Sequence, residues 1–484
     1  MNKLKVITMT SIALLSLSSA FADDYGFSSF GDDAISSVSS IDTSSSDNSF
    51  SFSSFSDVSY SEDASLVITG SASTSSRVYL QDYDTDSLAG ETDISTELEL
   101  DMSYSADNSE LVGTLLLNDD TLETYTEDII NELTYRAYTD DFIFEAGKTK
   151  IVWGRGDKVH VLDLICANDY TDFINEDYID RRIAENEFDV TWNIPSSQNL
   201  SLQLVFTPGM TVDRLATDGR WESSSVSSLE SYITTYATTM INNSSSYADA
   251  IIAAEAYSDL DTYYTDTDSL EYSQYGARLT GSAEKFDWGA EYYYGHYKTP
   301  SVSYNTSTGI TLDYDQLQAF GFDGETVVCA YTLRNEFAYY LTDDLDGDDA
   351  SVHNNSVNWV VGVDRDLPWG EMNINIQDLG SYILNYDNVS SAYDIDYNSS
   401  DTAIQNTIVL NLSDSILAGS LNPQISTLWT IETGDVIIMP EFDYRLKDDF
   451  TVNVCASFIY GNDDSNYYAY QNNSFVEFSA DYAF

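Results

Sequence analysis

The chain has few basic residues and, beyond its first residues, no long apolar run. Its 484 residues contain 19 Lys plus Arg against 81 Asp plus Glu, which gives a formal net charge of −62. Such a chain would repel nucleic acids and other polyanions, so a nucleic-acid partner is excluded. No later segment approaches the roughly 20 consecutive apolar residues of a membrane-spanning helix, which excludes a helical membrane protein.

Cysteine is also scarce. The three cysteines, Cys166, Cys329 and Cys455, are scattered and odd in number, so neither a disulfide framework nor a zinc site is predicted. Because free cysteine packs as a small hydrophobic residue, we interpret Cys329 and Cys455 as apolar residues of strands.

Residues suited to catalysis or metal binding are few. The only histidines, His160, His296 and His353, are too far apart in sequence to indicate a Ser/His or metal site, although a barrel could bring them together. The acidic run DDLDGDD at 343–349 lacks the glycine position and the closing glutamate of a calcium loop. We therefore expect no enzymatic activity, no specific metal site and no cofactor, beyond weak divalent-cation binding by acidic loops.

The beginning of the chain has the composition of a secretory signal. Two lysines precede a short apolar run, and Ala-Phe-Ala follows it at 20–22, so residues 1–22 are predicted to be a signal peptide. Residues 23–65 are dominated by serine and aspartate. Because this segment cannot bury enough apolar area to offset its chain entropy, we expect a flexible N-terminal arm.

The rest of the chain, 66–484, shows period-two alternation of apolar and polar residues. In 96–106, Leu98 and Leu100 alternate with Glu97, Glu99 and Asp101, so one face of a strand is apolar and the other acidic. The pattern recurs at 187–194, 200–206, 286–292 and 441–446. Lipid wets one side of a transmembrane barrel wall and water the other, so the pattern predicts an all-β fold, a transmembrane antiparallel β-barrel. The residues expected on the lipid face include Leu98, Trp192, Trp288 and Phe478.

Short turns and long loops alternate along this part of the chain. The short turns are predicted at 107–108, 139–141, 195–199, 283–285, 323–324, 366–370, 413–415 and 447–449. The longer polar connections are predicted at 81–93, 119–128, 154–186, 209–269, 299–310, 343–355, 387–402 and 461–474, with one short exception at 432–435. Short periplasmic turns and long outer loops are typical of outer-membrane barrels, and the segments between them number about 18, with 16 as the other even count. Loops 154–186 and 209–269 are the longest, and helical spacing in the second predicts short helices in outer loops.

The last residues form the sharpest local pattern. In SFVEFSADYAF, Phe478 and Tyr482 face one way while Glu477 and Asp481 face the other. A last strand that ends in Phe484 resembles the signal that barrel-assembly machinery recognises in Gram-negative outer-membrane proteins. The resemblance implies that machinery, together with outer-membrane lipid, as partners.

Two blocks of sequence resemble a known family. The first comprises GKTKIVWGRGD at 147–157, a strand pair that ends in VFTPG, and GRW at 219–221; the second comprises LRNEFAYY at 333–340 and WVVGVDRDLPWGEMNINIQ at 359–377. In this order they resemble a family of large, porin-like Gram-negative outer-membrane barrels of unknown function. The resemblance implies a barrel in the cell outer membrane and no particular solute.

Residues 155–157, Arg-Gly-Asp, match a tripeptide that adhesion receptors bind, within the longer frame that begins at Trp153. We expect a strand at 142–153 whose Trp153 lies in the aromatic girdle, with glycines at 154 and 156 that let the chain turn sharply. The loop that follows contains both signs of charge and is the third outer loop, whose counterpart folds into the lumen of general porins. We therefore expect it to fold inward, while an unremarkable surface loop and a receptor-binding loop are the other interpretations. The residues assigned to this constriction loop are Trp153, Gly154, Arg155, Asp157, Asp163, Asp169, Arg181 and Arg182.

The polar face of the alternating strands is expected to line the pore. Its charged residues are predicted to be Glu97, Glu99, Asp101, Glu132, Arg136, Glu187, Asp189, Arg278, Asp287, Glu291, Arg334, Glu441, Asp443 and Arg445. Carboxylates outnumber arginines in this set, and rings of carboxylates attract cations. The sequence therefore predicts a channel for passive diffusion of small hydrophilic solutes, preferentially cationic or neutral. The alternative is a surface-exposed barrel without an open pore that acts as an adhesin or structural protein, and the oligomeric state is not predicted.

Overall fold

The computed structural model describes residues 65–81, 91–172, 174, 178–195, 199–217, 219–222, 265–305, 309–389, 394–462, 465 and 467–484. The predicted signal peptide and nearly all of the predicted arm lie outside these residues. So do the helical patches predicted within loop 209–269, because residues 223–264 are not described.

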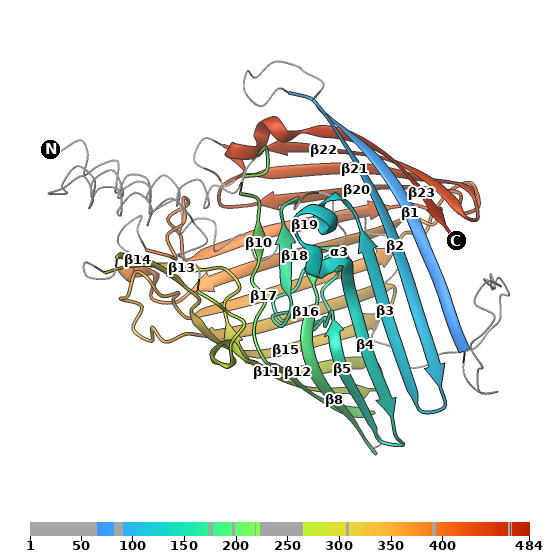
Figure 1. Ribbon diagram of the computed structural model, residues 1–484. Coiled ribbons are helices and arrows are strands. Elements are labelled where there is room, and N and C mark those ends of the chain that lie inside the picture. Colours follow the sequence, from blue (N-terminus) through green and yellow to red (C-terminus); the bar gives the residue numbers. More distant parts are fainter. Residues whose placement is uncertain are drawn as a thin grey trace, which may run out of the picture.

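An 18-stranded antiparallel sheet forms the body of the protein and closes on itself (Figure 1). The first half comprises β1 (Ser65–Tyr79), β2 (Thr92–Ala106), β3 (Ser109–Leu117), β4 (Ile130–Tyr138), β5 (Phe142–Thr149), β8 (Glu185–Ile194), β9 (Leu200–Thr207), β11 (Gln274–Ala283) and β12 (Phe286–His296). The second half comprises β15 (Gln316–Val328), β16 (Tyr331–Leu341), β17 (Ser356–Asp366), β18 (Asn373–Ile383), β19 (Ile404–Ser413), β20 (Leu421–Thr430), β21 (Val436–Lys447), β22 (Phe450–Tyr460) and β23 (Phe475–Ala483). Each strand pairs with the next of this series, and β23 pairs with β1. The predicted all-β barrel is confirmed.

Closure leaves no sheet edge, which a barrel in lipid requires because an unpaired backbone group there has no water to bind. Gly70 and Phe484 complete the seam by exchanging both backbone hydrogen bonds at 2.9 Å. A Cβ on Gly70 would lie 2.6 Å from the carbonyl oxygen of Glu99, so the seam needs a glycine at this position.

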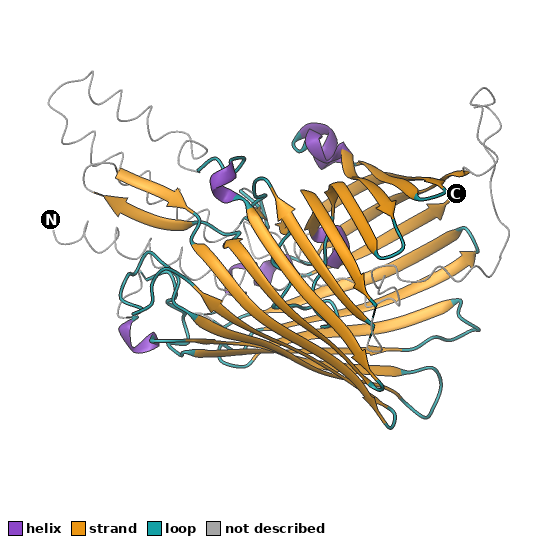
Figure 2. Ribbon diagram, turned by 90° about the horizontal axis from the view of Figure 1, so that it is seen from below, coloured by secondary structure: helices purple, strands orange, loops and turns teal. Residues whose placement is uncertain are grey.

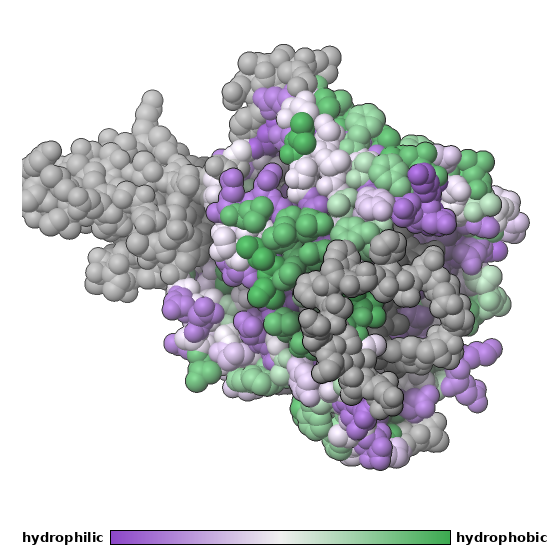
Figure 3. Space-filling model, turned by 45° about the vertical axis from the view of Figure 1, so that its right-hand side comes forward, coloured by the Kyte–Doolittle hydropathy of each residue, from purple (hydrophilic) through white to green (hydrophobic). Residues whose placement is uncertain are grey.

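The pleat separates apolar from polar side chains as the alternation predicted. Leu98 pairs with Ala72 on one face while Glu99 pairs with Ser71 on the other. Many large apolar side chains remain exposed on the first of these faces, among them Phe188 at 60%, Phe478 at 54% and Trp192 at 37%. Figure 3 shows apolar residues across part of the visible face, with hydrophilic residues mainly toward its margins. An apolar exterior around a closed sheet is the surface of a membrane barrel. Among the described residues, no helix is both long and apolar enough to cross a membrane.

Short turns and long connections alternate as predicted, with one error. The turn expected at 323–324 does not exist: Asp323 and Gly324 lie inside β15, and the turn falls at Cys329 and Ala330. Gly324 is needed within the strand because a Cβ there would lie 2.8 Å from the ring of Phe286.

Cys329 was also wrongly interpreted as a packed strand residue. It is exposed and occupies the β15–β16 turn with a φ of 61°, in the left-handed region. Cys455 does lie on a strand, β22, and is partly buried.

The long connections carry the remaining elements (Figure 2). These are α2 (Asp119–Glu123), η1 (Thr126–Ile129), β6 (Ala167–Tyr170), α3 (Tyr178–Arg181), β7 (Arg182–Ile183), β10 (Arg214–Leu215), η3 (Leu270–Tyr272), β13 (Ser301–Asn305), β14 (Gly309–Asp313), η4 (Tyr386–Asn388) and η5 (Tyr468–Asn473). Short helices are thus present in the connections before β4 and β8, whereas those predicted within loop 209–269 lie outside the described residues.

Candidate functional site

The loop 150–184, between β5 and β8, is bound to the polar face of the opposite wall. Glu336, on β16 and fully buried, accepts hydrogen bonds from the backbone N–H groups of Arg155 (2.7 Å), Gly156 (2.6 Å) and Val161 (2.8 Å). His160 Nδ1 lies 2.7 Å from the same carboxylate. One side chain therefore holds both arms of the turn at 154–161, which places this loop on the inner face of the barrel.

Two arginines meet at Asp323, on the strand next to Glu336. Arg155, from the loop, places Nε 2.6 Å from Asp323 Oδ1, and Arg278, from β11, places Nη2 2.9 Å from Oδ2. Arg278 also lies 3.6 Å from Glu291. The Asp323 carboxylate is fully buried, and its two charged partners offset the cost of removing its charge from water.

Asp157 continues the contact onto β18. Its N–H donates to Gln377 Oε1 (2.9 Å), the Gln377 amide donates back to its carbonyl oxygen (2.8 Å), and its carboxylate accepts from Asn375. Arg334 lies 3.9 Å from that carboxylate. The Arg-Gly-Asp tripeptide is thus engaged by the inner wall at both of its charged residues.

Trp153 was predicted to end a strand and to lie in the aromatic girdle, and this prediction is wrong. Strand β5 ends at Thr149, and the chain has already turned inward when it reaches Trp153. The indole is 2% exposed, packs over Gly276 and donates to Gln203 Oε1 at 3.0 Å. Gly154, with a φ of 107°, lies against the Glu336 carboxylate, and a Cβ on Gly156 would lie 1.9 Å from the carbonyl oxygen of Val159. The two glycines therefore allow the chain to approach Glu336.

The charges farther along the loop are paired locally. Arg182 Nη2 lies 3.1 Å from Asp163, whose other oxygen accepts from the Tyr178 hydroxyl. Asp169 lies 3.5 Å from Arg214, which the sequence did not single out. Arg181 is 1% exposed, with its guanidinium 5.3 Å from the ring centre of Tyr170. Asp163 and Asp169 are thus paired within and between loops.

Burial and neighbouring charges shift the protonation of loop groups. Burial alone would lower the pKa of His160, but the adjacent Glu336 carboxylate outweighs it and the net pKa is raised. Burial raises the pKa of Asp157, with Arg334 opposing the shift. Burial also raises the pKa of the Cys166 thiol to about 12. His160 is therefore favoured as a cation paired with Glu336.

The strand register places the whole set of wall charges predicted from sequence on one face. Residues directly opposite in an antiparallel pair point to the same side, and pairs such as Arg278 with Glu291, Arg136 with Glu145 and Glu441 with Cys455 link the strands around the barrel. That face is the one that carries Glu336. It holds Glu97, Glu99, Asp101, Glu132, Arg136, Glu187, Asp189, Arg278, Asp287, Glu291, Arg334, Glu441, Asp443 and Arg445.

The partners of these charges differ around the wall. Arg136 lies 3.2 Å from Glu145, and Arg334 lies 3.2 Å from Glu325. On the opposite side, Glu441 and Asp443 accept hydrogen bonds from neutral amides, those of Gln424 and Asn453. Their negative charge is therefore not cancelled by these contacts.

Several residues of this region were missed from sequence. They are Arg77, Asp323, Glu336, Asn375 and Gln377. Arg77 joins the loop to the wall, 2.6 Å from Asp172 and 2.7 Å from Glu477. The alternation in LRNEFAYY, which places Arg334 and Glu336 on the polar face, was a signal that could have found Glu336.

The acidic run at 343–349 folds around one of its own side chains. The Asp344 carboxylate accepts from the N–H groups of Gly347 (2.9 Å) and Asp349 (2.8 Å). In the part of the chain that the structure describes, no group of three or more His, Cys, Asp or Glu residues has a geometry that could hold a metal ion.

No protein-family model and no curated protein matches the chain significantly. Among solved structures, OccAB4 of Acinetobacter baumannii is similar at 10% identity and a TM-score of 0.45, over 87% of this chain and 99% of that one. Wzi, an outer-membrane protein involved in group 1 capsule assembly in Escherichia coli, is similar at 10% identity and a TM-score of 0.44, over 86% of this chain and 84% of Wzi. A Rh. blastica porin mutant is similar at 9% identity and a TM-score of 0.37, over 87% of this chain and the whole of the porin. The function of this membrane barrel must therefore be argued from its own residues.

Proposed function

We propose that the protein is a porin-like channel of the outer membrane that admits small hydrophilic solutes by passive diffusion and prefers cationic and neutral solutes to anions. The observation that carries the proposal is the inner face of the closed sheet, where the predicted wall charges comprise ten carboxylates and four arginines. A barrel of this many strands is wide enough to enclose an aqueous channel. No enzymatic role is part of the proposal.

Selectivity follows from the wall acids that lack an arginine partner. On the side of β11, β15 and β16, Arg278 and Arg155 meet Asp323. Glu441 and Asp443 face the lumen from β21 with amide partners. Fields in water extend about 8 Å at physiological salt, a large part of a pore radius, so these carboxylates raise the local cation concentration.

The loop 150–184 is the proposed constriction. It is fixed to the inner wall through Glu336, Asp323 and Gln377, and its turn carries Arg155 and Asp157 into the lumen. Such fixed charges orient polar solutes and oppose apolar ones, which would cross a charged constriction without compensating bonds. The same contacts argue against adhesion, since the Arg-Gly-Asp tripeptide is occupied by the wall.

Single-channel recording in planar bilayers tests the proposal. We expect discrete conductance steps and, in a salt gradient, a reversal potential that shows cation preference. Replacing Glu441→Gln and Asp443→Asn together should reduce that preference without closing the channel. The matched control, Asp140→Asn with Glu371→Gln, removes the same charge from exposed residues of short turns and should leave the reversal potential unchanged. Electrical silence of the assembled barrel, or anion preference, would contradict the proposal.

A further inference from the structure

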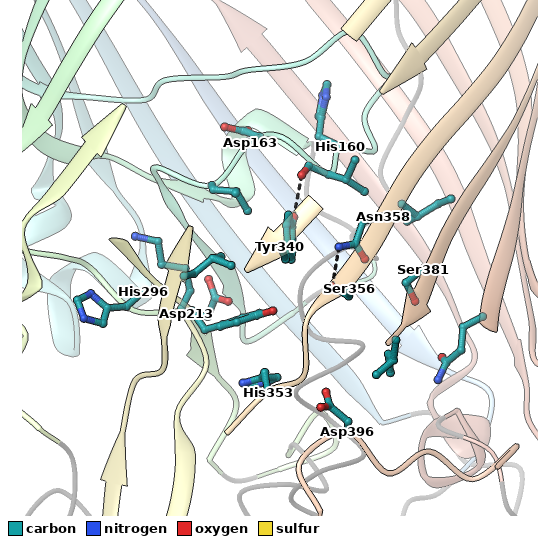
Figure 4. Close-up of a pocket in the computed structure, with 18 of the residues that line it drawn as sticks. His160, Asp163, Asp213, His296, Tyr340, His353, Ser356, Asn358, Ser381 and Asp396 are labelled. Atoms are coloured by element: carbon teal, nitrogen blue, oxygen red, sulfur yellow. Dashed lines mark hydrogen bonds between the residues drawn. The ribbon is translucent and has the colours of Figure 1, made fainter. Parts of the chain in front are cut away.

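A cavity of about 130 Å³ lies between loop 150–184 and the wall, at the ends of β12 and β15–β19 that join the long loops (Figure 4). All three histidines of the chain line it: His160 from loop 150–184, His296 from the end of β12 and His353 from the connection before β17. Figure 4 shows the labelled side chains surrounding Tyr340 from several elements. The three histidines are too far apart in sequence for this proximity to be predicted.

Most of the charged side chains around the cavity have an oppositely charged protein partner. His353 Nδ1 lies 2.6 Å from Asp315, a contact that helps to lower the pKa of that carboxyl against the effect of its burial. Lys298 Nζ donates to Gln274 at 2.8 Å and lies 3.8 Å from Glu185. His160 is paired with Glu336, and Arg182 with Asp163, as described above. A ligand that brought its own net charge would meet no uncompensated opposite charge among these groups.

The walls of the cavity nevertheless offer many hydrogen-bonding groups. Asp396 accepts from the Asn354 N–H, and burial raises its pKa to about 6, so near neutral pH it is mainly ionised and acts as an acceptor. On another side, Asn358 and Ser381 add amide and hydroxyl groups (Figure 4). The lining therefore offers both donors and acceptors, which suits hydroxyl groups, each of which donates once and accepts twice.

Two aromatic surfaces and the volume limit the size of the ligand. The Tyr297 ring stacks on His353 with centroids 4.1 Å apart and planes at 14°, and Tyr340 donates its hydroxyl to the Val161 carbonyl at 2.7 Å. Both present carbon surface to C–H groups. A cavity of about 150 Å³ holds a six-carbon ring, so this one accommodates about six non-hydrogen atoms.

We propose that the cavity is a binding site for a small neutral polyol of about the size of glycerol. Hydroxyl groups of the ligand would pair with the Asp396 carboxylate and, on the other side, with the Asn358 amide and the Ser381 hydroxyl. The site does not depend on conduction, because it lies behind the loop and is built entirely from side chains of this chain.

The test is saturation-transfer NMR on the full-length protein in detergent, with glycerol as the probe. We expect a saturable signal that equimolar glycine or acetate does not displace. Asn358→Leu, which fills the cavity and removes an amide, should weaken glycerol binding about tenfold or more. Asn411→Leu, at an equally buried polar position of the inner face outside the cavity, should not.

Absence of saturable glycerol binding to the native barrel would overturn the proposal. So would equal weakening by the two substitutions, or displacement by glycine or acetate, which would mean a site for charged solutes. If Asn358→Leu fails to assemble, Asn358→Ala and the competition with glycine decide instead. Because binding is measured without a membrane, failure here leaves the bilayer test of conduction intact, and electrical silence there leaves this test intact.

Discussion

The proposed constriction loop is held by one buried carboxylate, and Glu336→Gln tests that dependence. The substitution keeps the shape of the side chain but replaces one oxygen with an amino group and removes the charge. Glu336 accepts from three backbone N–H groups and pairs with His160. In either orientation of the new glutamine amide, its NH₂ group faces at least one of these backbone N–H groups, so two donors meet. The ion pair with His160 also loses its negative partner. Hydrogen bonds to charged groups contribute about 1.5–3 kcal/mol each, so two lost contacts cost about 3 kcal/mol or more.

That cost shifts the ratio of docked to undocked loop by about 100-fold, since each 1.4 kcal/mol is a factor of ten. We expect larger single-channel conductance and more current noise, together with faster proteolysis within 155–181. The control is Glu145→Gln, the same change at a carboxylate of the inner face that pairs with Arg136 and not with the loop. If the assembled Glu336→Gln barrel has the conductance and noise of the native protein, the loop is not held by this residue or does not set the aperture.

Three further outcomes are expected. Gly156→Ala should also increase conductance, because its Cβ would lie 1.9 Å from the Val159 carbonyl oxygen, whereas Gly113→Ala, with a nearest contact of 3.2 Å, should not; equal currents would contradict this. A maleimide at mildly alkaline pH should label the exposed Cys329 in the native barrel and the buried Cys166, whose pKa is about 12, only after unfolding, as mass spectrometry of the peptides can show. Because the pKa of His160 is raised above its usual value, the stabilisation of loop docking is fully present below about pH 6.5 and is lost as the pH rises through the raised pKa. Conductance should therefore rise as the pH increases through the raised pKa of His160, and His160→Gln should abolish this rise. The groups that face His160 are Glu336, Asp163, Arg182 and Tyr178.

The barrel wall was predictable because lipid and water impose one pattern on every strand. Leu98 beside Glu99 could only be placed on opposite faces, and repetition of that choice gave the charged face. The alternation of short turns and long loops gave the strand count. Individual turns were less predictable. Asp323-Gly324 has the composition of a hairpin turn, but here the glycine makes room for the Phe286 ring and the aspartate binds two arginines within the barrel.

The contacts of the inner loop could not be predicted for a different reason. Glu336 lies about 180 residues from the loop that it binds, and in sequence it looks like any other carboxylate of the polar face. Glu336 binds the loop because it lies opposite the turn at 154–161, whose N–H groups point away from their own chain. Only the closed barrel brings Glu336 and this turn together. Trp153 shows the same limit, since an aromatic residue after a strand suits a membrane interface and an inner wall equally well.

The scarcity of cations explains the asymmetry of the lumen. Most arginines that contact the inner face bridge two acids: Arg77 joins Asp172 to Glu477, Arg136 joins Glu110 to Glu145, Arg278 joins Glu291 to Asp323, and Arg334 joins Asp157 to Glu325. An arginine serves this role better than a lysine because its planar fork can meet two carboxylates at once. The chain has only 19 basic residues, and Glu441 and Asp443 of β21 have amide partners although Arg445 lies on the same face of that strand. If the proposed cation preference rests on these two carboxylates, an arginine introduced at Gln424 should reduce the preference more than one placed on any outer loop.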